Sequence, residues 1–296
     1  MHIDIVSVFP QYFETLTLSL LGKAREKGLI SVEARNLRDW TCDVHHAVDD
    51  TPCGGGAGMV MKPAVWGECL DELLGLEASD ISENAGYTTF CQAVQSGRNV
   101  KISRKYEARE GTVLIFPNPS APLFTQNDAK ELSQKKHIIF GCGRYEGYDA
   151  RIPRYYETRG VDVREYSIGD YVLNGGEAAV SVMLEAITRL IPGFMGNPDS
   201  IVEESYSGED SLLEHAQFTK PARWRGMDVP EIYMSGHHAK IEAAKRSESL
   251  IRTSNIRPDL VERIHCEKLS EEDRKTLISQ GWDVSGEHPR KISAER

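Results

Sequence analysis

Residues 137–177 contain two segments of strand character, and each ends in a glycine-rich loop. The first is the isoleucine-rich run 137–140, which leads into Gly141-Cys142-Gly143. The second covers 161–166, and its loop ends at Asn174-Gly175-Gly176-Glu177, where a helical pattern begins. Such strand ends form small-molecule pockets in α/β proteins, because glycine lets the backbone approach a ligand closely. We therefore expect a pocket here, with these polar groups nearby: Arg144, Tyr145, Glu146, Asp170 and Tyr171.

The rest of the first 190 residues alternates between strand and helix patterns. Residues 2–9 read as a buried strand that Pro10 ends, residues 12–21 have apolar side chains at helical spacing, and 30–36 form a second short strand. This β-α-β order favours a parallel sheet. Further elements are a strand at 111–116 and helices at 63–76, 126–133 and 177–190, with Thr125 as an N-cap and Ala178, Val182, Ala186 and Ile187 on the apolar face of the last helix.

Composition limits the classes of protein that fit. The 296 residues suit one large or two modest domains, and a net charge of −10 argues against a uniformly basic nucleic-acid-binding surface. No run of about 18 apolar residues is present, and the N-terminus lacks the pattern of a signal peptide. The six cysteines form no CxxC pair. We therefore expect a cytoplasmic protein with reduced thiols, no zinc framework and no membrane association.

Residues 38–61 show no periodicity and combine a His/Asp cluster with Gly54-Gly55-Gly56-Ala57-Gly58. Three interpretations compete for this long loop. It is a metal site, although the spacing fits no standard ligand set. It is a polar structural loop. Or it closes over a ligand or substrate, for which the glycines supply the backbone freedom.

Two other regions depart from the α/β pattern. Residues 77–110 lose periodicity and become basic in their second part, which indicates an exposed insertion. After a Pro- and Gly-containing linker near 191–207, residues 196–219 carry six acidic residues and neither Lys nor Arg. Residues 220–257 then carry eight basic residues against four acidic ones in a helical pattern. This last region is either a nucleic-acid contact or a solvated helix face.

The residues alone do not identify the ligand. The loop 141–147 reads G-x-G-x-x-x-G rather than the G-x-G-x-x-G of dinucleotide-binding folds. No phosphate-binding P-loop and no nucleophile elbow are present, and the His237-His238 pair lacks zinc spacing. The residues predict an α/β protein with a glycine-lined cofactor pocket and a small basic C-terminal domain.

Five longer motifs resemble the bacterial tRNA (guanine-37 N1)-methyltransferases. They are GRYEG at 143–147, SIGDYVLNGGE at 167–177, VDDTPCGGGAGM at 48–59, RLIPGFMGN at 189–197 and SGHHAKI at 235–241. They stand in that family's order and spacing over nearly the whole chain. The insertion at 77–110 and a C-terminal tail are in excess of the family pattern.

The resemblance implies a fold and an organisation that the strand pattern does not predict. It implies a SPOUT-class parallel sheet with a deep trefoil knot, in a catalytic domain over 1–192 that carries the insertion at about 77–110. A linker over 193–207 would lead to a helical tRNA-binding domain over 208–296. Members of the family are homodimers with the active site at the subunit interface. Knotted chains are very rare among protein folds, so the strand pattern alone would not lead us to expect a knot.

The resemblance also implies which residues bind S-adenosylmethionine and tRNA. The cofactor residues carried over by motif are Phe116, Pro117, Pro119, Gly141, Gly143, Tyr145, Glu146, Ser167, Ile168, Gly169, Asp170, Tyr171, Val172, Leu173, Gly175 and Gly176. The tRNA residues are His45, Asp50, Gly55, Gly56, Lys220 and Arg223. For Glu146 the contact is with the positively charged methionine end or with a bound Mg²⁺, and no ligand spacing supports the metal independently. Otherwise Arg144 and Glu146 form a structural ion pair under the loop.

For catalysis, the family places a general base in an E-D-S-[FH] linker and an Arg ahead of I-P-G. Here the Arg is Arg189, and the linker reads Glu203-Glu204-Ser205-Tyr206, so Glu204 occupies the position of the base. Glu has one more methylene than Asp, and catalysis is sensitive to displacements of that size. Either the linker backbone compensates or Glu203 or Asp210 serves instead. The expected product is 1-methylguanosine at position 37, beside the anticodon of tRNA.

Three rival functions remain open at this point. A knotted methyltransferase that acts on another RNA or on a ribose 2′-OH needs no base at the edge of a nucleobase. A non-catalytic RNA-binding homologue would tolerate Glu204 in place of Asp. A dinucleotide-dependent oxidoreductase is disfavoured by the glycine spacing.

Overall fold

The computed structural model describes residues 1–76, 111–197 and 204–292. The predicted insertion at 77–110 and Glu203 lie outside these residues. The chain divides into two compact units, Met1–Gly196 and Asn197–Arg296, and each is described by itself.

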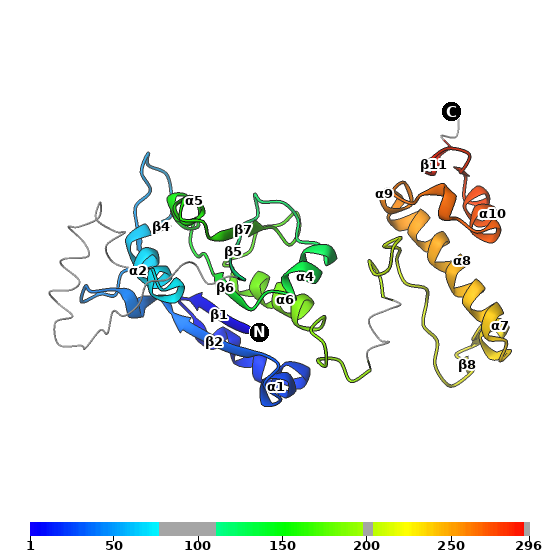
Figure 1. The fold of residues 1–296 in the computed structure, drawn as a ribbon, viewed down its shortest axis with the longest axis horizontal. Coiled ribbons are helices and arrows are strands. Elements are labelled where there is room, and N and C mark those ends of the chain that lie inside the picture. The colour runs from blue at the N-terminus through cyan, green and yellow to red at the C-terminus, as the bar shows by residue number, and fades with distance from the viewer. Residues whose placement is uncertain (77–110, 198–203, 293–296) are drawn as a thin grey trace. The chain divides into compact units, whose positions relative to one another are not determined.

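The first unit is built on a five-stranded sheet in which all the neighbouring strands run parallel (Figure 1). Its strand order is β2-β1-β6-β5-β7, with β1 (His2–Ser7), β2 (Ser31–Asn36), β5 (Thr112–Pro117), β6 (His137–Gly141) and β7 (Asp162–Tyr166). The α/β class with a parallel sheet, predicted from the strand and helix pattern, is confirmed. Three central strands, β1, β5 and β6, are buried on both faces, which explains the continuous apolar runs within β5 and β6.

Helices cover both faces of this sheet. The core on one face combines Ile138 and Phe140 with η1 (Pro10–Thr17), α1 (Ser19–Glu26), α4 (Gln126–Leu132) and α6 (Glu177–Thr188). The core on the other face combines Leu114 and Ile139 with η2 (Leu37–Trp40), α2 (Pro63–Leu74) and α5 (Arg151–Thr158). Two short strands, β3 (Asp49–Asp50) and β4 (Val60–Met61), pair within the loop 38–61.

Most local predictions agree with these elements, and three differ. Thr125 caps α4 in a reciprocal capping box with Asp128, as predicted. The helical pattern at 12–21 is broken, because Leu18 is extended between η1 and α1. Helix α5 was not predicted as a separate element. Helix α6 buries Val180, Met183 and Leu184 together with the predicted Ile187, whereas Val182 is 52% exposed, so the predicted apolar face was wrong at Val182.

Two predictions about the whole chain can be compared with the described residues. No described helix is both long enough and apolar enough to cross a membrane. Cys53, Cys69, Cys142 and Cys266 are free thiols, whereas Cys42 is disulfide-bonded, so the expectation that the thiols are reduced is not met at Cys42.

The regular elements of the second unit begin with a β-hairpin and continue mainly in helices. Its elements are β8 (Arg223–Trp224), β9 (Met227–Asp228), α7 (Glu231–Met234), α8 (His238–Ile256), α9 (Pro258–Val261), η5 (Cys266–Lys268), α10 (Glu271–Ser279), β10 (Trp282–Asp283) and β11 (Arg290–Lys291). Its core packs Leu250 of α8 and Leu277 of α10 against Trp282. The predicted helical pattern at 220–257 therefore starts only at α7, after the hairpin.

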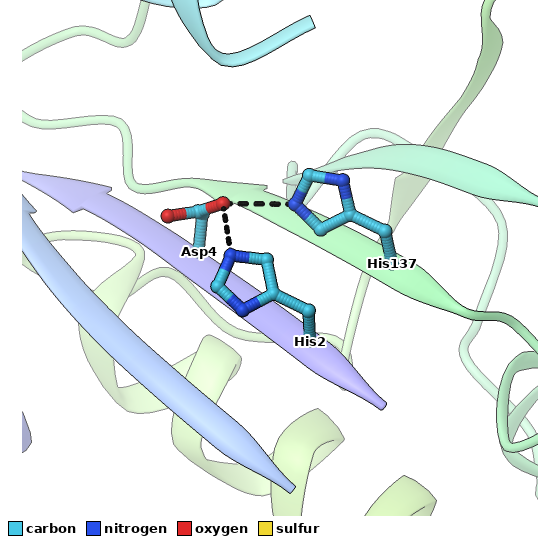
Figure 2. Close-up of side chains that lie close together, drawn as sticks. All are labelled: His2, Asp4 and His137. Atoms are coloured by element: carbon cyan, nitrogen blue, oxygen red, sulfur yellow. Dashed lines mark hydrogen bonds and ion pairs between the residues drawn. The ribbon is translucent and has the colours of Figure 1, made fainter. Parts of the chain in front are cut away.

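A buried polar cluster at the first residues of β1 was not foreseen (Figure 2). Asp4 is 2% exposed and accepts hydrogen bonds from Arg35 Nε at 2.6 Å and from His137 Nε2 at 2.8 Å. His2 Nε2 lies 3.0 Å from the same carboxylate. Both oxygens of Asp4 are thus engaged, and the cluster ties β1 to β2 and β6.

We expect Asp4→Asn to destabilise the protein by about 2 to 3 kcal/mol at pH 7. Burial alone would raise the pKa of Asp4, but the hydrogen bonds from His137 and Arg35 outweigh it and lower the pKa to about 2. Because this folded-state pKa lies below the unfolded value of about 3.9, the stabilisation is present above about pH 4 and is lost toward pH 2. Urea unfolding at pH 7 and pH 3 measures it. The difference between Asp4→Asn and the parent should fall by about half at pH 3, and a difference that does not change with pH would contradict the assignment. Glu14→Gln, at an exposed acid of η1, is the matched control.

Candidate active site

A cavity of about 690 Å³ lies where strands β5, β6 and β7 end. Its walls come from the three loops that follow these strands, from α5 and from the ends of β7 and α6 that adjoin the loops. The lining residues are Pro117, Asn118, Pro119, Ser120, Gly143, Tyr145, Glu146, Gly147, Tyr148, Ala150, Pro153, Arg154, Glu157, Glu165, Tyr166, Ser167, Ile168, Tyr171, Val172, Leu173, Gly175, Gly176 and Ala179. The carboxyl edge of a parallel sheet is where α/β proteins bind ligands.

Backbone hydrogen bonds hold the three loops together. The Gly176 amide donates to the Gly143 carbonyl at 2.9 Å, which joins the loop after β7 to the loop after β6. The Ser167 amide donates to the Pro122 carbonyl at 2.9 Å, which joins it to the loop after β5. The wall of the cavity is therefore a hydrogen-bonded assembly of loops that are far apart in the sequence.

Two glycines are required where these loops meet. A Cβ at Gly176 would lie 3.1 Å from Cys142 Cα and 3.2 Å from the Gly143 amide nitrogen. A Cβ at Gly175 would overlap the Arg144 side chain and lie 2.5 Å from Glu177 Oε2. Gly176 thus lets two backbones approach closely, and Gly175 leaves room for the side chains of Arg144 and Glu177.

The buried carboxylate of Glu177 holds the loop after β6 in place. Glu177 is 1% exposed and accepts hydrogen bonds from Ser7 Oγ at 2.6 Å and from Arg144 Nε at 3.0 Å. The Arg144 guanidinium also lies over the Phe9 ring, 4.7 Å from its centroid. Arg144 therefore forms its structural ion pair with Glu177, not with Glu146 as the structural alternative proposed.

Two side chains that form one wall of the cavity, Glu165 and Tyr148, were not predicted from the sequence. Glu165 of β7 accepts hydrogen bonds from Tyr148 Oη at 2.5 Å and from Asn118 Nδ2 at 2.9 Å. Burial and the hydrogen bond to Glu165 raise the pKa of Tyr148 well above its ordinary value, so this phenol stays protonated. Asn118 follows β5 directly, and that position at a strand end was the signal available in the sequence.

The structure brings most of the predicted cofactor residues to this cavity. Those that line it are Pro117, Pro119, Gly143, Tyr145, Glu146, Ser167, Ile168, Tyr171, Val172, Leu173, Gly175 and Gly176. Phe116, Gly141, Gly169 and Asp170 do not line it. Phe116 is buried against Trp66 and Tyr148, and a Cβ at Gly141 would overlap its ring. Gly141 is therefore needed to accommodate the Phe116 ring.

The loop 38–61 joins the loop after β6 at the rim of the cavity. The Met61 amide donates to the Gly147 carbonyl at 2.9 Å, and the Glu146 amide donates to the Met59 carbonyl at 3.0 Å. His45, Asp50, Gly55 and Gly56, the predicted tRNA residues of this loop, are exposed. Among the described residues, the His/Asp groups with metal-binding geometry are His2-Asp4-His137 and the set His265, Glu287 and His288. Neither includes a residue of this loop, so the structure gives the metal interpretation no support.

The predicted catalytic residues belong to different units. Arg189 is the C-cap of α6 in the first unit and is half-buried. Glu204 is half-buried in the second unit and lines a shallow cavity of about 260 Å³, together with Asp210, Glu214 and Arg246. Lys220 and Arg223 are exposed, and Arg223 Nε lies 3.7 Å from Asp228.

Comparison with known proteins identifies the family. The family described as tRNA (Guanine-1)-methyltransferase TrmD matches residues 1–97 and 92–263. A protein of Bifidobacterium animalis subsp. lactis named tRNA (guanine-N(1)-)-methyltransferase is 65% identical over 99% of both chains. Proteins with the same name from Cutibacterium acnes and Thermobifida fusca are 49% and 46% identical, over 88% and 97% of this chain and 97% and 98% of theirs. The chain belongs to the TrmD family of tRNA (guanine-1)-methyltransferases.

Proposed function

We propose that this protein transfers a methyl group from S-adenosylmethionine to N1 of guanosine 37 in tRNA, giving 1-methylguanosine. The observation that carries the proposal is the 65% identity, over 99% of both chains, to a protein named tRNA (guanine-N(1)-)-methyltransferase. The glycine-lined cavity at the carboxyl edge of the sheet supports it, because a methyltransferase of this kind needs a site for its methyl donor.

The residues around the cavity fit S-adenosylmethionine, which supplies an electrophilic methyl group when bound. Gly143, Gly175 and Gly176 present backbone groups without side chains, and Tyr145, Tyr171 and Leu173 add exposed apolar surface suited to an adenine ring. Glu146 lines the cavity and offers a carboxylate to the cationic methionine end. A Mg²⁺ ion held at Glu146 is a further part of the proposal and has no independent ligand set.

The chemistry of guanine N1 sets what the protein's own side chains must do. N1 carries a proton at neutral pH, and it becomes nucleophilic only as a base removes that proton. Glu204 takes this role. Negative charge then develops on O6, and Arg189 stabilises it. The remaining acceleration comes from holding the base, turned out of its stack, in line with the reacting group.

The architecture of the proposal goes beyond the parallel sheet. Its elements are a deep trefoil knot formed by the loops after β5, β6 and β7, a catalytic domain over 1–192, a linker over 193–207 and a tRNA-binding domain over 208–296. The predicted tRNA contacts are His45, Asp50, Gly55, Gly56, Lys220 and Arg223. The bridges Leu123–Ser167 and Arg144–Gly175 support the knot, because they bind these three loops tightly to one another. A cytoplasmic location follows from tRNA as the substrate.

A homodimer with the active site at the subunit interface is also proposed. Exposed apolar side chains on and beside η1, α1 and α6 support it, because an interface between subunits would cover such side chains. Element η1 contacts both α1 and α6. The exposed side chains are Phe9, Tyr12, Leu18, Leu20 and Val182.

Incubation with methyl-labelled S-adenosylmethionine and unmodified tRNA transcripts tests the proposal. Transcripts with guanosine at positions 36 and 37 should be labelled, and transcripts in which guanosine 37 is replaced should not. Digestion to nucleosides should release 1-methylguanosine. A 2′-O-methylated nucleoside would instead favour a ribose methyltransferase. Binding of tRNA without binding of S-adenosylmethionine, measured by calorimetry, would favour a non-catalytic homologue.

A further inference from the structure

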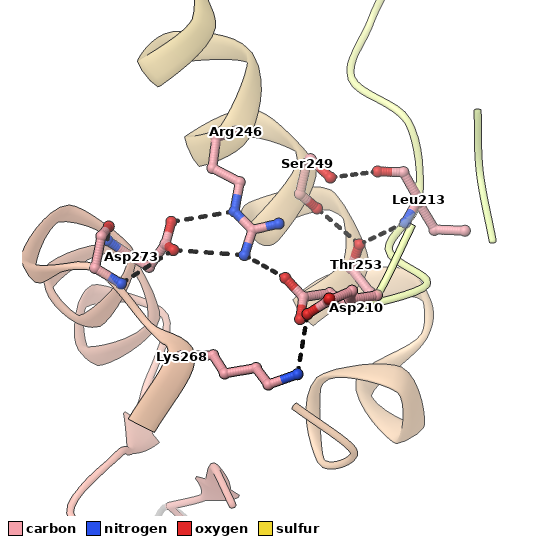
Figure 3. A network of polar contacts seen from close by, with 9 residues as sticks. Asp210, Leu213, Arg246, Ser249, Thr253, Lys268 and Asp273 are labelled. Atoms are coloured by element: carbon pink, nitrogen blue, oxygen red, sulfur yellow. Dashed lines mark hydrogen bonds and ion pairs between the residues drawn. The ribbon is translucent and has the colours of Figure 1, made fainter. Parts of the chain in front are cut away.

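Residues 210–216 are held against helix α8 by side chains of that helix, and Figure 3 shows the contacts at Asp210 and Leu213. The Leu213 amide donates to Thr253 Oγ1 at 2.9 Å, and the Leu213 carbonyl accepts from Ser249 Oγ at 2.5 Å. The Ala216 amide donates to Glu248 Oε1 at 3.1 Å. Leu212 adds its side chain to the core of the second unit. The end of the segment is therefore an integral part of this unit.

Arg246 holds the middle of the segment. Its Nη2 donates to Asp210 Oδ2 at 2.6 Å, and its Nε donates to Asp273 Oδ1 at 3.2 Å. Asp273 is itself fixed, because it forms the capping box of α10 with Ser270. One guanidinium thus bridges the segment and two helices, which a planar group with several fixed donors does better than an ammonium.

Contacts within the segment extend this anchoring to Glu204. The Tyr206 amide donates to the Leu212 carbonyl at 2.9 Å, and the Glu214 amide donates to Ser205 Oγ at 2.9 Å. The Ser207 amide donates to the Glu204 carbonyl at 3.0 Å. Residues 204–214 are therefore a closed loop, with Glu204 at one end and Asp210 inside it.

We infer that Arg246 is a positioning residue. Its hydrogen bonds to Asp210 and Asp273 hold the loop that carries Glu204 in place on the second unit. This inference rests on the proposed role of Glu204 as the base. A glutamate has one more rotatable bond than the family's aspartate, so its carboxylate depends more on a fixed backbone. Without the guanidinium, Asp210 and Asp273 lose their shared cation and repel each other, and the loop that carries Glu204 loses its central support.

The variants Arg246→Met, Arg246→Lys and Asp210→Asn test this inference by single-turnover methyl transfer at saturating tRNA and S-adenosylmethionine. We expect Arg246→Met and Asp210→Asn to lower the rate constant by about tenfold to a hundredfold. Arg246→Lys should be intermediate, because an ammonium can pair with Asp210 but cannot bridge both carboxylates in the same way. The dissociation constant for tRNA should stay within about threefold of the parent, so the loss is in turnover. Arg263→Met, which removes a largely exposed arginine of the same unit, is the matched control and should have the parent rate.

The same substitution in a Glu204→Gln background separates the possible outcomes. If Arg246 acts through Glu204, Arg246→Met should change the residual rate of the Glu204→Gln enzyme by less than about twofold, because coupled residues are not additive. An equal loss in both backgrounds, or parent rates for both Arg246→Met and Asp210→Asn, would overturn the inference. If Glu204→Gln itself has the parent rate, the proposed base has failed and the inference falls with it. If Arg246→Met does not fold, the single-turnover rate of the isosteric variant Asp210→Asn tests the inference instead.

Discussion

Glu204→Ala should lower the single-turnover rate of methyl transfer to guanosine 37 by about three orders of magnitude, within the range that a general base contributes. The side chain is the proposed acceptor of the N1 proton, and alanine offers no acceptor in its place. Glu204→Asp should remain active, because it restores the residue of the family pattern and has nearly the same reference pKa. The measurement is a rapid-quench time course at saturating S-adenosylmethionine and excess enzyme.

The neighbouring acids provide the control and the alternative. Glu209→Ala removes an exposed carboxylate of the same segment that pairs with Lys268 at 2.9 Å, and it should keep the parent rate. Asp210 is a poor substitute for the base, because its carboxylate already accepts from Arg246. An active Glu204→Ala enzyme would refute the assignment and direct attention to Glu203.

The parallel sheet was predictable because burial on both faces leaves a direct trace in the sequence. Strands such as 112–117 and 137–141 are therefore mostly apolar, with central runs of buried aliphatic and aromatic side chains. The face of α6 left no such trace. This helix has apolar residues on more than one side, so the sequence does not show which side faces the core. Packing against the rest of the fold buries Met183 and leaves Val182 exposed.

The candidate site was predictable where it depends on local backbone and unpredictable where it depends on distant partners. Gly175 and Gly176 were found because paired glycines after a strand end usually mark a close approach of backbones. The partner of Arg144 was not, because Glu177 lies 33 residues further along the chain and the two side chains meet only in the fold. Phe116 was expected to face the cofactor, yet a side chain at a strand end can point to either face of the sheet, and this one points into the core.

The anchoring of Glu204 shows the same limit in the second unit. Motif spacing locates the residue that occupies the position of the base, but it says nothing of what holds that residue. Asp210, Arg246 and Asp273 are each ordinary charged residues in the sequence. Their significance depends on a bridge across 36 and 27 residues of chain.

Arg189→Lys should lower the single-turnover rate by about tenfold to a hundredfold, and Arg189→Ala by about a hundredfold to a thousandfold. Arg189 is the C-cap of α6, where a cation is favoured by the helix dipole. If that were its whole role, lysine would serve as well, because it keeps the positive charge. The proposed role requires donors directed at O6 as charge develops there, and a planar guanidinium and a flexible ammonium differ in that respect.

Comparison with a second helix end separates these two roles of Arg189. Arg159 is the C-cap of α5, so Arg159→Lys makes the same chemical change at an equivalent position outside the proposed chemistry. Both lysine variants should unfold at nearly the parent temperature, since each retains the cation at its helix end. Only Arg189→Lys should be slow. If both lysine variants have the parent rate, Arg189 acts only as the C-cap of α6. Another donor must then stabilise the negative charge on O6.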